Sequence, residues 1–127
     1  MRAIRYGLLL ALVLGLVAYQ SPDARATCAV GTPYNAFAHE TITVSSTAVG
    51  FNSVLYDQAS GQATAALVSV AADAIRFFSD GTILPTASVG HPVASGSTVE
   101  VCGFANVKNF RMIRQTNDAT ITVSYFR

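Results

Sequence analysis

Histidines, the side chains that most often carry protons or bind metals near neutral pH, are few in this sequence of 127 residues. There are two, His39 and His91. His39 directly precedes Glu40, and neighbouring side chains of a strand point to opposite faces, which is the wrong arrangement for a shared metal ion. His91 stands between Gly90 and Pro92, where we expect its ring to cap a turn by hydrogen bonding. Neither histidine predicts a catalytic or metal site.

The carboxylates and serines form no catalytic pattern either. The acidic residues after position 26 are Glu40, Asp57, Asp73, Asp80, Glu100 and Asp118. They are spread one to a predicted loop or strand, without the paired-carboxylate pattern of a glycosidase. No G-x-S-x-G nucleophile elbow is present in the sequence. We therefore predict that the chain is not an enzyme and that it uses no cofactor and no metal.

The cysteines can do redox or cross-linking chemistry. Cys28 and Cys102 belong to no C-x-x-C motif and to no motif with a histidine, which argues against a redox or zinc role. In an oxidising compartment the two would pair and close most of the chain into one loop. The chain-entropy model gives such a bridge about 4 kcal/mol. The alternative is a pair of free, buried thiols.

The beginning of the chain predicts where the protein is sent. Arg2 and Arg5 supply positive charge, and an uninterrupted apolar run follows over residues 7–18. This run is shorter than the roughly 20 residues that span a bilayer. A positive start followed by a short apolar run is typical of an export signal.

A cleavage pattern follows the apolar run. Ala24 and Ala26 form an A-x-A pattern suited to cleavage before Thr27. We predict a cleaved signal peptide over residues 1–26 and a single domain over residues 27–127. The alternative is that residues 1–26 stay attached as an anchor, and they would then be the chain's contact with a membrane.

Net charge gives little indication of a polyanionic partner. After residue 26, five bases oppose six acids, a net charge of about −1, so the overall field does not favour nucleic acid. Lys108, Arg111 and Arg114 lie close together in sequence and could touch a polyanion, but the solvated face of a strand is the commoner reason for such a cluster. We expect no specific nucleic-acid partner.

Short runs of β-branched and aromatic residues alternate with clusters of Gly, Pro, Asn and Asp, which is typical of strands joined by tight turns. The predicted strands are residues 40–49, 53–56, 63–73, 75–78, 98–102, 110–114 and 120–126. Alternation is cleanest in the last run, where Ile121, Val123 and Tyr125 are predicted to face inward. The fold predicted is all-β, an antiparallel β-sandwich or jelly-roll-like barrel of about seven to eight short strands.

Turn formers and breakers separate these runs. Asp80 and Gly81, between two apolar runs, predict a hairpin or turn. Pro85 and Pro92 exclude the segment between them from the centre of a sheet, so residues 83–97 are predicted to be a long connection. Further turns are predicted at residues 57–62, 103–106 and 117–118. No amphipathic helix is expected after residue 26.

Adjacent aromatic residues point to an interface. The pairs Phe77-Phe78 and Tyr125-Phe126 cannot place both members in one sandwich core, because neighbouring strand side chains face opposite ways. One member of each pair is then available to a neighbouring subunit, since aromatic side chains are enriched at interfaces. We predict a homo-oligomer; the interface candidates are Phe78, Tyr125, Phe126, Arg111 and Arg114.

An ordered set of segments carries a family resemblance. The segments are ITVSSTAVGF (42–51), IRFFSDGT (75–82), PTASVGHP (85–92), Gly96 with VEVCG (99–103), NFRMIR (109–114) and DATITVSYFR (118–127). Together they resemble small β-rich virion-associated, head-decoration-like structural proteins of tailed phages and prophages, from about Glu40 to the end. The resemblance implies a structural role as a symmetric oligomer on a particle, in contact with other virion proteins, and a location in the virion.

Two features differ from that family's pattern, namely the predicted signal peptide and the cysteine pair. They favour a competing class, an exported bacterial surface or pilin-like or coat-like subunit with a Cys28–Cys102 disulfide, located in the periplasm or outside the cell. A third class, a carbohydrate- or ion-binding module, has only the loop residues Asp80, His91 and Asn106 in its favour.

Overall fold

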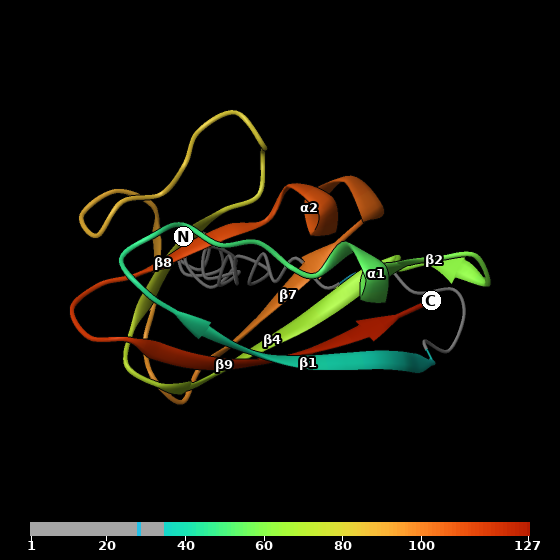
Figure 1. Cartoon of the computed structure of the whole chain (residues 1–127), viewed down its shortest axis with the longest axis horizontal. Coiled ribbons are helices and arrows are strands. Elements are labelled where there is room, and N and C mark those ends of the chain that lie inside the picture. Colours follow the sequence, from blue (N-terminus) through green and yellow to red (C-terminus); the bar gives the residue numbers. More distant parts are fainter. Residues whose placement is uncertain (1–27, 29–34) are drawn as a thin grey trace, which may run out of the picture.

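The computed structural model describes Cys28 and residues 35–127 (Figure 1). The strands are β1 (Ala36–Val44), β2 (Asp57–Gln58), β3 (Gly61–Gln62), β4 (Ala65–Ala72), β5 (Ile75–Phe78), β6 (His91–Val93), β7 (Thr98–Cys102), β8 (Arg111–Arg114) and β9 (Ala119–Phe126). The helices are α1 (Ser53–Tyr56) and α2 (Phe104–Asn109). The predicted signal segment 1–26, with Ala24, Ala26 and the cleavage point before Thr27, lies outside the described residues.

All strand pairs are antiparallel, which confirms the all-β prediction. A larger sheet has the strand order β1-β9-β4-β7 and a smaller one the order β6-β5-β8, and β2 pairs with β3 in a separate hairpin. The larger and smaller sheets form two layers with one hydrophobic core between them (Figure 1). Of the described strands in the larger sheet, β1 and β7 are the outermost.

Strand β9 shows how the sequence pattern produces this arrangement. Ile121, Val123 and Tyr125 have no exposed surface, while the residues between them are partly or wholly exposed. β9 lies between β1 and β4, so its backbone is paired on both sides and its inner face meets the second layer. The inward prediction for these three side chains is confirmed.

Two segments are helical where the sequence predicted a strand and a turn. Residues 53–56 form α1 because the side chain of Asn52 accepts the Val54 N–H at 3.1 Å, and this cap starts a helical turn. The predicted turn at residues 103–106 instead opens α2, whose first N–H bond runs from Val107 to the Gly103 carbonyl at 3.1 Å. Among the described residues, no helix is long and apolar enough to cross a membrane.

The described residues contain nine strands, more than the predicted seven to eight. The short hairpin of β2 and β3 lies inside the predicted turn 57–62, and β6 lies inside the predicted connection 83–97. β6 contains Pro92 and is an edge strand of its sheet, the position at which a missing N–H is tolerated.

Aromatic rings form a continuous column through the core. The centroid distances between successive rings are 4.9 Å for Phe77–Phe110, 4.6 Å for Phe110–Phe51, 5.8 Å for Phe51–Tyr125, 6.2 Å for Tyr125–Tyr56 and 6.0 Å for Tyr56–Phe104. Such ring pairs contribute about 0.5–1.5 kcal/mol each beyond the burial of their area. The column joins the two sheets and both helices, and we refer to it as the aromatic column.

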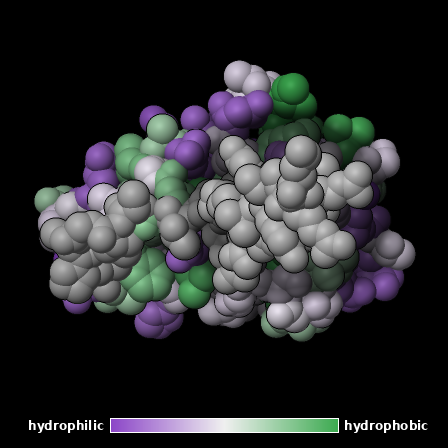
Figure 2. Space-filling model, turned by 180° about the vertical axis from the view of Figure 1, so that it is seen from behind, coloured by the Kyte–Doolittle hydropathy of each residue, from purple (hydrophilic) through white to green (hydrophobic). Residues whose placement is uncertain are grey.

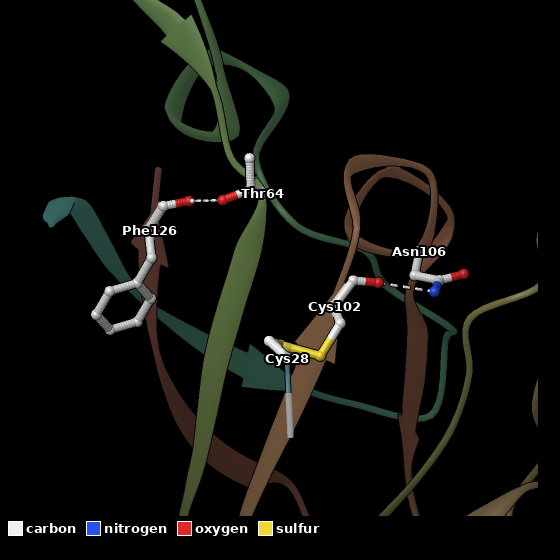
Figure 3. The surroundings of a disulfide bond; sticks show 5 residues. All are labelled: Cys28, Thr64, Cys102, Asn106 and Phe126. Atoms are coloured by element: carbon white, nitrogen blue, oxygen red, sulfur yellow. Dashed lines mark hydrogen bonds between the residues drawn. A yellow bond between two sulfur atoms is a disulfide. The ribbon is translucent and has the colours of Figure 1, made fainter. Parts of the chain in front are cut away.

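A disulfide joins Cys28 to Cys102 at the end of β7 (Figure 3), as expected for an oxidising compartment. The two Cα atoms are 5.2 Å apart and the residues are separated by 74 positions. Around the bridge, the Asn106 amide donates to the Cys102 carbonyl at 2.8 Å, and the Thr64 hydroxyl donates to the Phe126 carbonyl at 3.3 Å. The bridge therefore fixes Cys28 to the edge strand of the larger sheet.

Removing the disulfide should destabilise the protein strongly. Replacing Cys28 and Cys102 together by alanine frees the unfolded chain of a 74-residue constraint, and the free energy of unfolding should fall by about 4 kcal/mol. Urea unfolding followed by circular dichroism measures the change, with the reduced wild-type protein as the matched control. A double variant and a reduced wild type that unfold at the wild-type midpoint would contradict this role of the bridge.

Candidate functional site

The histidines are not brought together. His39 is exposed on the outer face of β1, whereas His91 lies in β6, where it pairs with Phe77. Its ring lies 5.3 Å from that of Phe77 and 5.6 Å from that of Phe78. The prediction that His91 caps a turn is wrong, because β6 extends the small sheet through this residue. Among the described residues, no three His, Cys, Asp or Glu side chains gather as a group that could hold a metal ion.

An ionisable pair joins the edge strand β1 to the core. Glu40 points inward from β1, where it accepts the Tyr125 hydroxyl and, at 3.0 Å, the Asn52 N–H. Burial of Tyr125, followed by this bond to Glu40, raises the pKa of the phenol well above its ordinary value. An inward-pointing charge on an edge strand also hinders pairing with another chain. The role of the Tyr125–Glu40 pair is therefore to stabilise the fold.

Among the aromatic interface candidates, the prediction for Tyr125 is wrong. Its side chain has no exposed surface and belongs to the aromatic column, so it cannot contact another subunit. Phe126 and Phe78 are partly exposed. Phe126 lies on the outer face of the larger sheet, beside a shallow hollow of about 90 Å³ that Cys28 also lines. Phe78 belongs to the smaller sheet, so the two candidates lie on different layers.

The two arginine side chains among the interface candidates bind groups of their own chain. Arg111 Nη1 donates to the carbonyls of Lys108 at 3.1 Å and Phe110 at 2.7 Å, and so closes the end of α2. Arg114 forms a salt bridge with Asp118 four residues later. Arg111 is the register partner of Phe78, and these are the two interface candidates that the smaller sheet brings together.

The three loop residues that favoured a carbohydrate- or ion-binding module make separate contacts within the chain. The carboxylate of Asp80 accepts the Thr82 N–H at 3.1 Å and its hydroxyl at 2.9 Å. These bonds, the backbone one first, lower the pKa of the Asp80 carboxyl below its ordinary value. Asn106 is bonded to the Cys102 carbonyl and His91 lies against the Phe77 ring. Their polar groups do not converge on one ligand.

Exposed aliphatic side chains mark a different site. Among the described residues, the large hydrophobic ones that are more than half exposed are Val54 (74%), Ile83 (57%), Leu84 (63%) and Val89 (52%). The last three belong to residues 79–90, the connection from β5 to β6, which we call the docking loop. It projects beyond the sheets at the top of Figure 1, and the space-filling view shows hydrophobic surface at the same end (Figure 2).

Hydrogen bonds connect the last part of the docking loop to β5 and to itself. Arg76, on β5, donates from Nε to the Ala87 carbonyl at 3.0 Å and from Nη1 to the Gly90 carbonyl at 2.9 Å. Thr86 and Val89 exchange backbone bonds of 2.9 and 3.2 Å. The Arg76 bonds tie the segment 86–90 to the small sheet, and the Thr86–Val89 bonds close the segment on itself.

Packing at the base of the docking loop reinforces these bonds. Pro85 is buried although its neighbours are exposed. Gly90 has φ +131, and a Cβ there would lie 3.2 Å from the Phe77 carbonyl and 3.3 Å from the Pro85 Cβ. A larger residue at position 90 would therefore strain the backbone and push the loop from the sheet. Val89 therefore lies on a segment that is bonded to β5, and the Ile83 N–H is bonded to the Asp80 carboxylate at 3.4 Å.

A hollow of about 180 Å³ opens beside the base of the docking loop, and we call it the mouth. The mouth is lined by Phe77, Ser79, Val99, Glu100, Val101, Cys102 and Asn106. It lies where the edge strand β7 faces β5 of the other sheet, so the inward side chains of Val99 and Val101 and the end of the aromatic column form its apolar part.

The backbone of β7 also faces this opening. The Gly103 N–H donates to the Thr64 carbonyl at 2.7 Å, and the Val70 N–H donates to the Ser97 carbonyl at 2.9 Å. In an antiparallel pair the backbone groups of alternate residues point to opposite sides. The N–H and C=O of Glu100 therefore point away from β4, to the side on which no described strand pairs with β7.

Sequence reasoning missed this site. Pro85 and Pro92 correctly excluded a central strand from the predicted connection 83–97, which contains only the edge strand β6, but the exposure of Ile83 within it was not foreseen. An isoleucine–leucine pair immediately before a proline, inside a predicted connection, was the available signal, because such a pair has no strand in which to be buried.

Comparison with known proteins found no family model, no curated protein and no solved structure that matches the chain. A functional assignment therefore depends on the docking loop, the mouth and the segments that carry the resemblance.

The Tyr125–Glu40 bond predicts how stability depends on pH. Because the pKa of Tyr125 is raised in the folded state, the unfolded chain releases this proton first, and stability should be lost as the pH rises above about 10. Tyr125→Phe should remove this part of the decline and, below pH 10, lower the free energy of unfolding by roughly 1–3 kcal/mol through the lost bond.

Denaturant unfolding on both sides of pH 10 measures both effects. Tyr56→Phe is the matched control, because it alters a buried tyrosine but leaves the Tyr125–Glu40 bond in place. If the Tyr125→Phe variant lost stability with rising pH as steeply as the wild type, the assignment would be wrong.

Arg76→Lys should loosen the docking loop. A lysine ammonium lacks the planar fork that reaches two carbonyls at once, so one of the bonds to Ala87 and Gly90 is lost. We expect hydrogen exchange at the Val89 N–H to become roughly tenfold faster, as for the loss of about 1.4 kcal/mol. Arg114→Lys is the matched control. Equal exchange rates in the two variants would show that Arg76 does not hold the loop.

Proposed function

We propose that this chain is a non-enzymatic structural subunit that attaches to other protein subunits through its docking loop. The observation that carries the proposal is the exposure of Ile83, Leu84 and Val89 on a connection whose Ala87 and Gly90 carbonyls are bonded by Arg76 of β5. A segment that is already ordered loses little conformational entropy when it binds. Aliphatic side chains that stay in contact with water in the isolated chain gain free energy when a partner covers them.

The charges near the docking loop favour a protein partner over a membrane. Residues 79–90 contain one acidic residue, Asp80, and no lysine or arginine. Segments that bind anionic lipid surfaces normally carry several basic residues, each of which adds about 1 kcal/mol. The apolar side chains of this loop have no such support, so an apolar surface of another protein suits them better.

The assembly that we propose is the virion of a tailed phage or prophage, with this chain as a decoration or accessory subunit. The segments IRFFSDGT (75–82) and PTASVGHP (85–92) are among those that resemble the virion-associated family, and together they span most of the docking loop and its anchor Arg76. Residues of those segments maintain the shape of the loop, since the Asp80 carboxylate accepts the Thr82 N–H and Gly90 has a positive φ that suits glycine.

A second candidate is an exported surface or coat-like subunit. The Cys28–Cys102 disulfide favours it, because such bonds form and persist in oxidising compartments. The two candidates share the same docking loop and differ in where the assembled protein is found.

Leu84→Asp should prevent incorporation of the chain into its assembly. A carboxylate at this exposed position leaves the fold intact but places a charge in the apolar contact. Particles and the periplasmic and extracellular fractions of the source cells would be isolated and mapped by mass spectrometry, without reduction. The wild type in particles supports the virion role, and the wild type only in exported fractions supports the second candidate.

Val54→Asp is the matched control, because Val54 is the remaining strongly exposed aliphatic residue among those described and lies on α1, outside the loop. We expect it to assemble as the wild type does. Equal recovery of the Leu84→Asp and Val54→Asp variants from the assembled fraction would overturn the role of the docking loop.

A further inference from the structure

We propose that the Asp80–Gly81 peptide of the docking loop is a modification site, at which the main chain converts spontaneously to isoaspartate at a rate that Thr82 sets. This inference goes beyond the proposed function and does not depend on what the loop binds. In the first step the Gly81 nitrogen attacks the carboxyl carbon of the protonated Asp80 side chain. Water leaves with one carboxyl oxygen, the carboxyl proton and the amide proton. In the second step water opens the succinimide ring at either carbonyl, which restores aspartate or gives isoaspartate.

Gly81 makes this peptide reactive. A residue without a side chain leaves the approach to its nitrogen unhindered and tolerates the backbone angles that ring closure requires. No group of the described residues accepts the Gly81 N–H, so this nitrogen is not held by the fold. The sequence contains one Asp-Gly pair and no Asn-Gly pair. The other described aspartates are followed by glutamine or alanine, and these are Asp57, Asp73 and Asp118.

The fold restrains the reaction through the Asp80 carboxylate. Its Oδ1 accepts the Thr82 N–H at 3.1 Å and the Ile83 N–H at 3.4 Å, and its Oδ2 accepts the Thr82 hydroxyl at 2.9 Å. Whichever oxygen leaves as water, at least one of these bonds is lost. The Thr82 bonds, the backbone one first, also favour the ionised form and lower the pKa of the carboxyl, whereas the reaction needs the protonated acid.

Isomerisation changes the beginning of the docking loop. The isoaspartyl main chain is longer by one methylene, and its free carboxylate is carried on Cα instead of on Cβ. Gly81 packs closely on α2, since a Cβ at this position would lie 2.7 Å from the Asn109 side chain. The added methylene therefore requires a shift of the main chain, which moves Ile83 and Leu84 relative to the sheets.

Incubation in heavy-oxygen water measures the reaction at residue 80. The full chain is purified as the cell leaves it, incubated folded at neutral pH, returned to ordinary water, digested and mapped by mass spectrometry. Each opening of the succinimide adds one heavy oxygen, and electron-based fragmentation distinguishes isoaspartate from aspartate. We expect residue 80 to gain both heavy oxygen and isoaspartate over a period in which Asp73 and Asp118 gain neither.

Thr82→Val tests the restraint. Valine keeps the branched shape and the backbone bond but loses the hydroxyl bond, so isomerisation should be roughly fivefold faster than in the wild type. Thr86→Val is the matched control, because its hydroxyl lies in the same loop but accepts the Val89 N–H and does not contact Asp80. It should react at the wild-type rate. In urea with a reducing agent, the three unfolded proteins should react at one common rate, faster than the folded wild type.

Two results would overturn the inference. If residue 80 gains no heavy oxygen, either folded or in urea, the peptide is not a modification site. If the folded Thr82→Val and Thr86→Val proteins react at equal rates, Thr82 does not set the rate. Both results are read from the mass of one peptide, so they are independent of the Leu84→Asp assembly experiment that decides the proposed function.

Discussion

The aromatic column is the interaction on which the rest of this structure depends. It runs from Phe77 through Phe110 and Tyr125 to Phe104, and so connects the small sheet, the large sheet and α2. Cores of this kind are close-packed, so a ring displaced at one point is felt by its neighbours. Phe77, at one end of the column, also lines the mouth, so the mouth adjoins the core.

The two outer strands of the larger sheet, β1 and β7, differ in the side chains and pairing found at their edges. At β1, the inward carboxylate of Glu40 and an irregularity in the pairing near Ala36 disturb a further strand, as is common at edges that must stay unpaired. At β7, the strand lines a hollow that has both apolar and polar side chains, near a loop with exposed aliphatic residues. The two edges of the larger sheet therefore differ from each other among the described residues.

Several features followed from local sequence. The alternation over residues 120–126 predicted the inner face of β9, and the two cysteines, together with the expectation of export, predicted their bridge. The interface residues were predicted less well: Tyr125 is wholly buried, and Arg111 binds carbonyls at the end of α2. Adjacent aromatics reveal that one must leave the core, but period-two alternation alone does not say whether the outer one meets solvent, a disulfide or another chain.

The sequence by itself determined the strand pattern and the turn residues, because these depend on backbone preferences and on side-chain alternation within a few residues. It also determined the near-neutral charge, which is a sum over the ionisable residues. The tertiary structure decided the rest. α1 depends on a cap from Asn52, whose own N–H is bonded to Glu40 twelve residues earlier, and the docking loop depends on Arg76 reaching carbonyls eleven and fourteen residues later. Contacts across such distances are formed only when the sheets pack, so exposure of the docking loop and the mouth beside β7 could not be read from neighbouring residues.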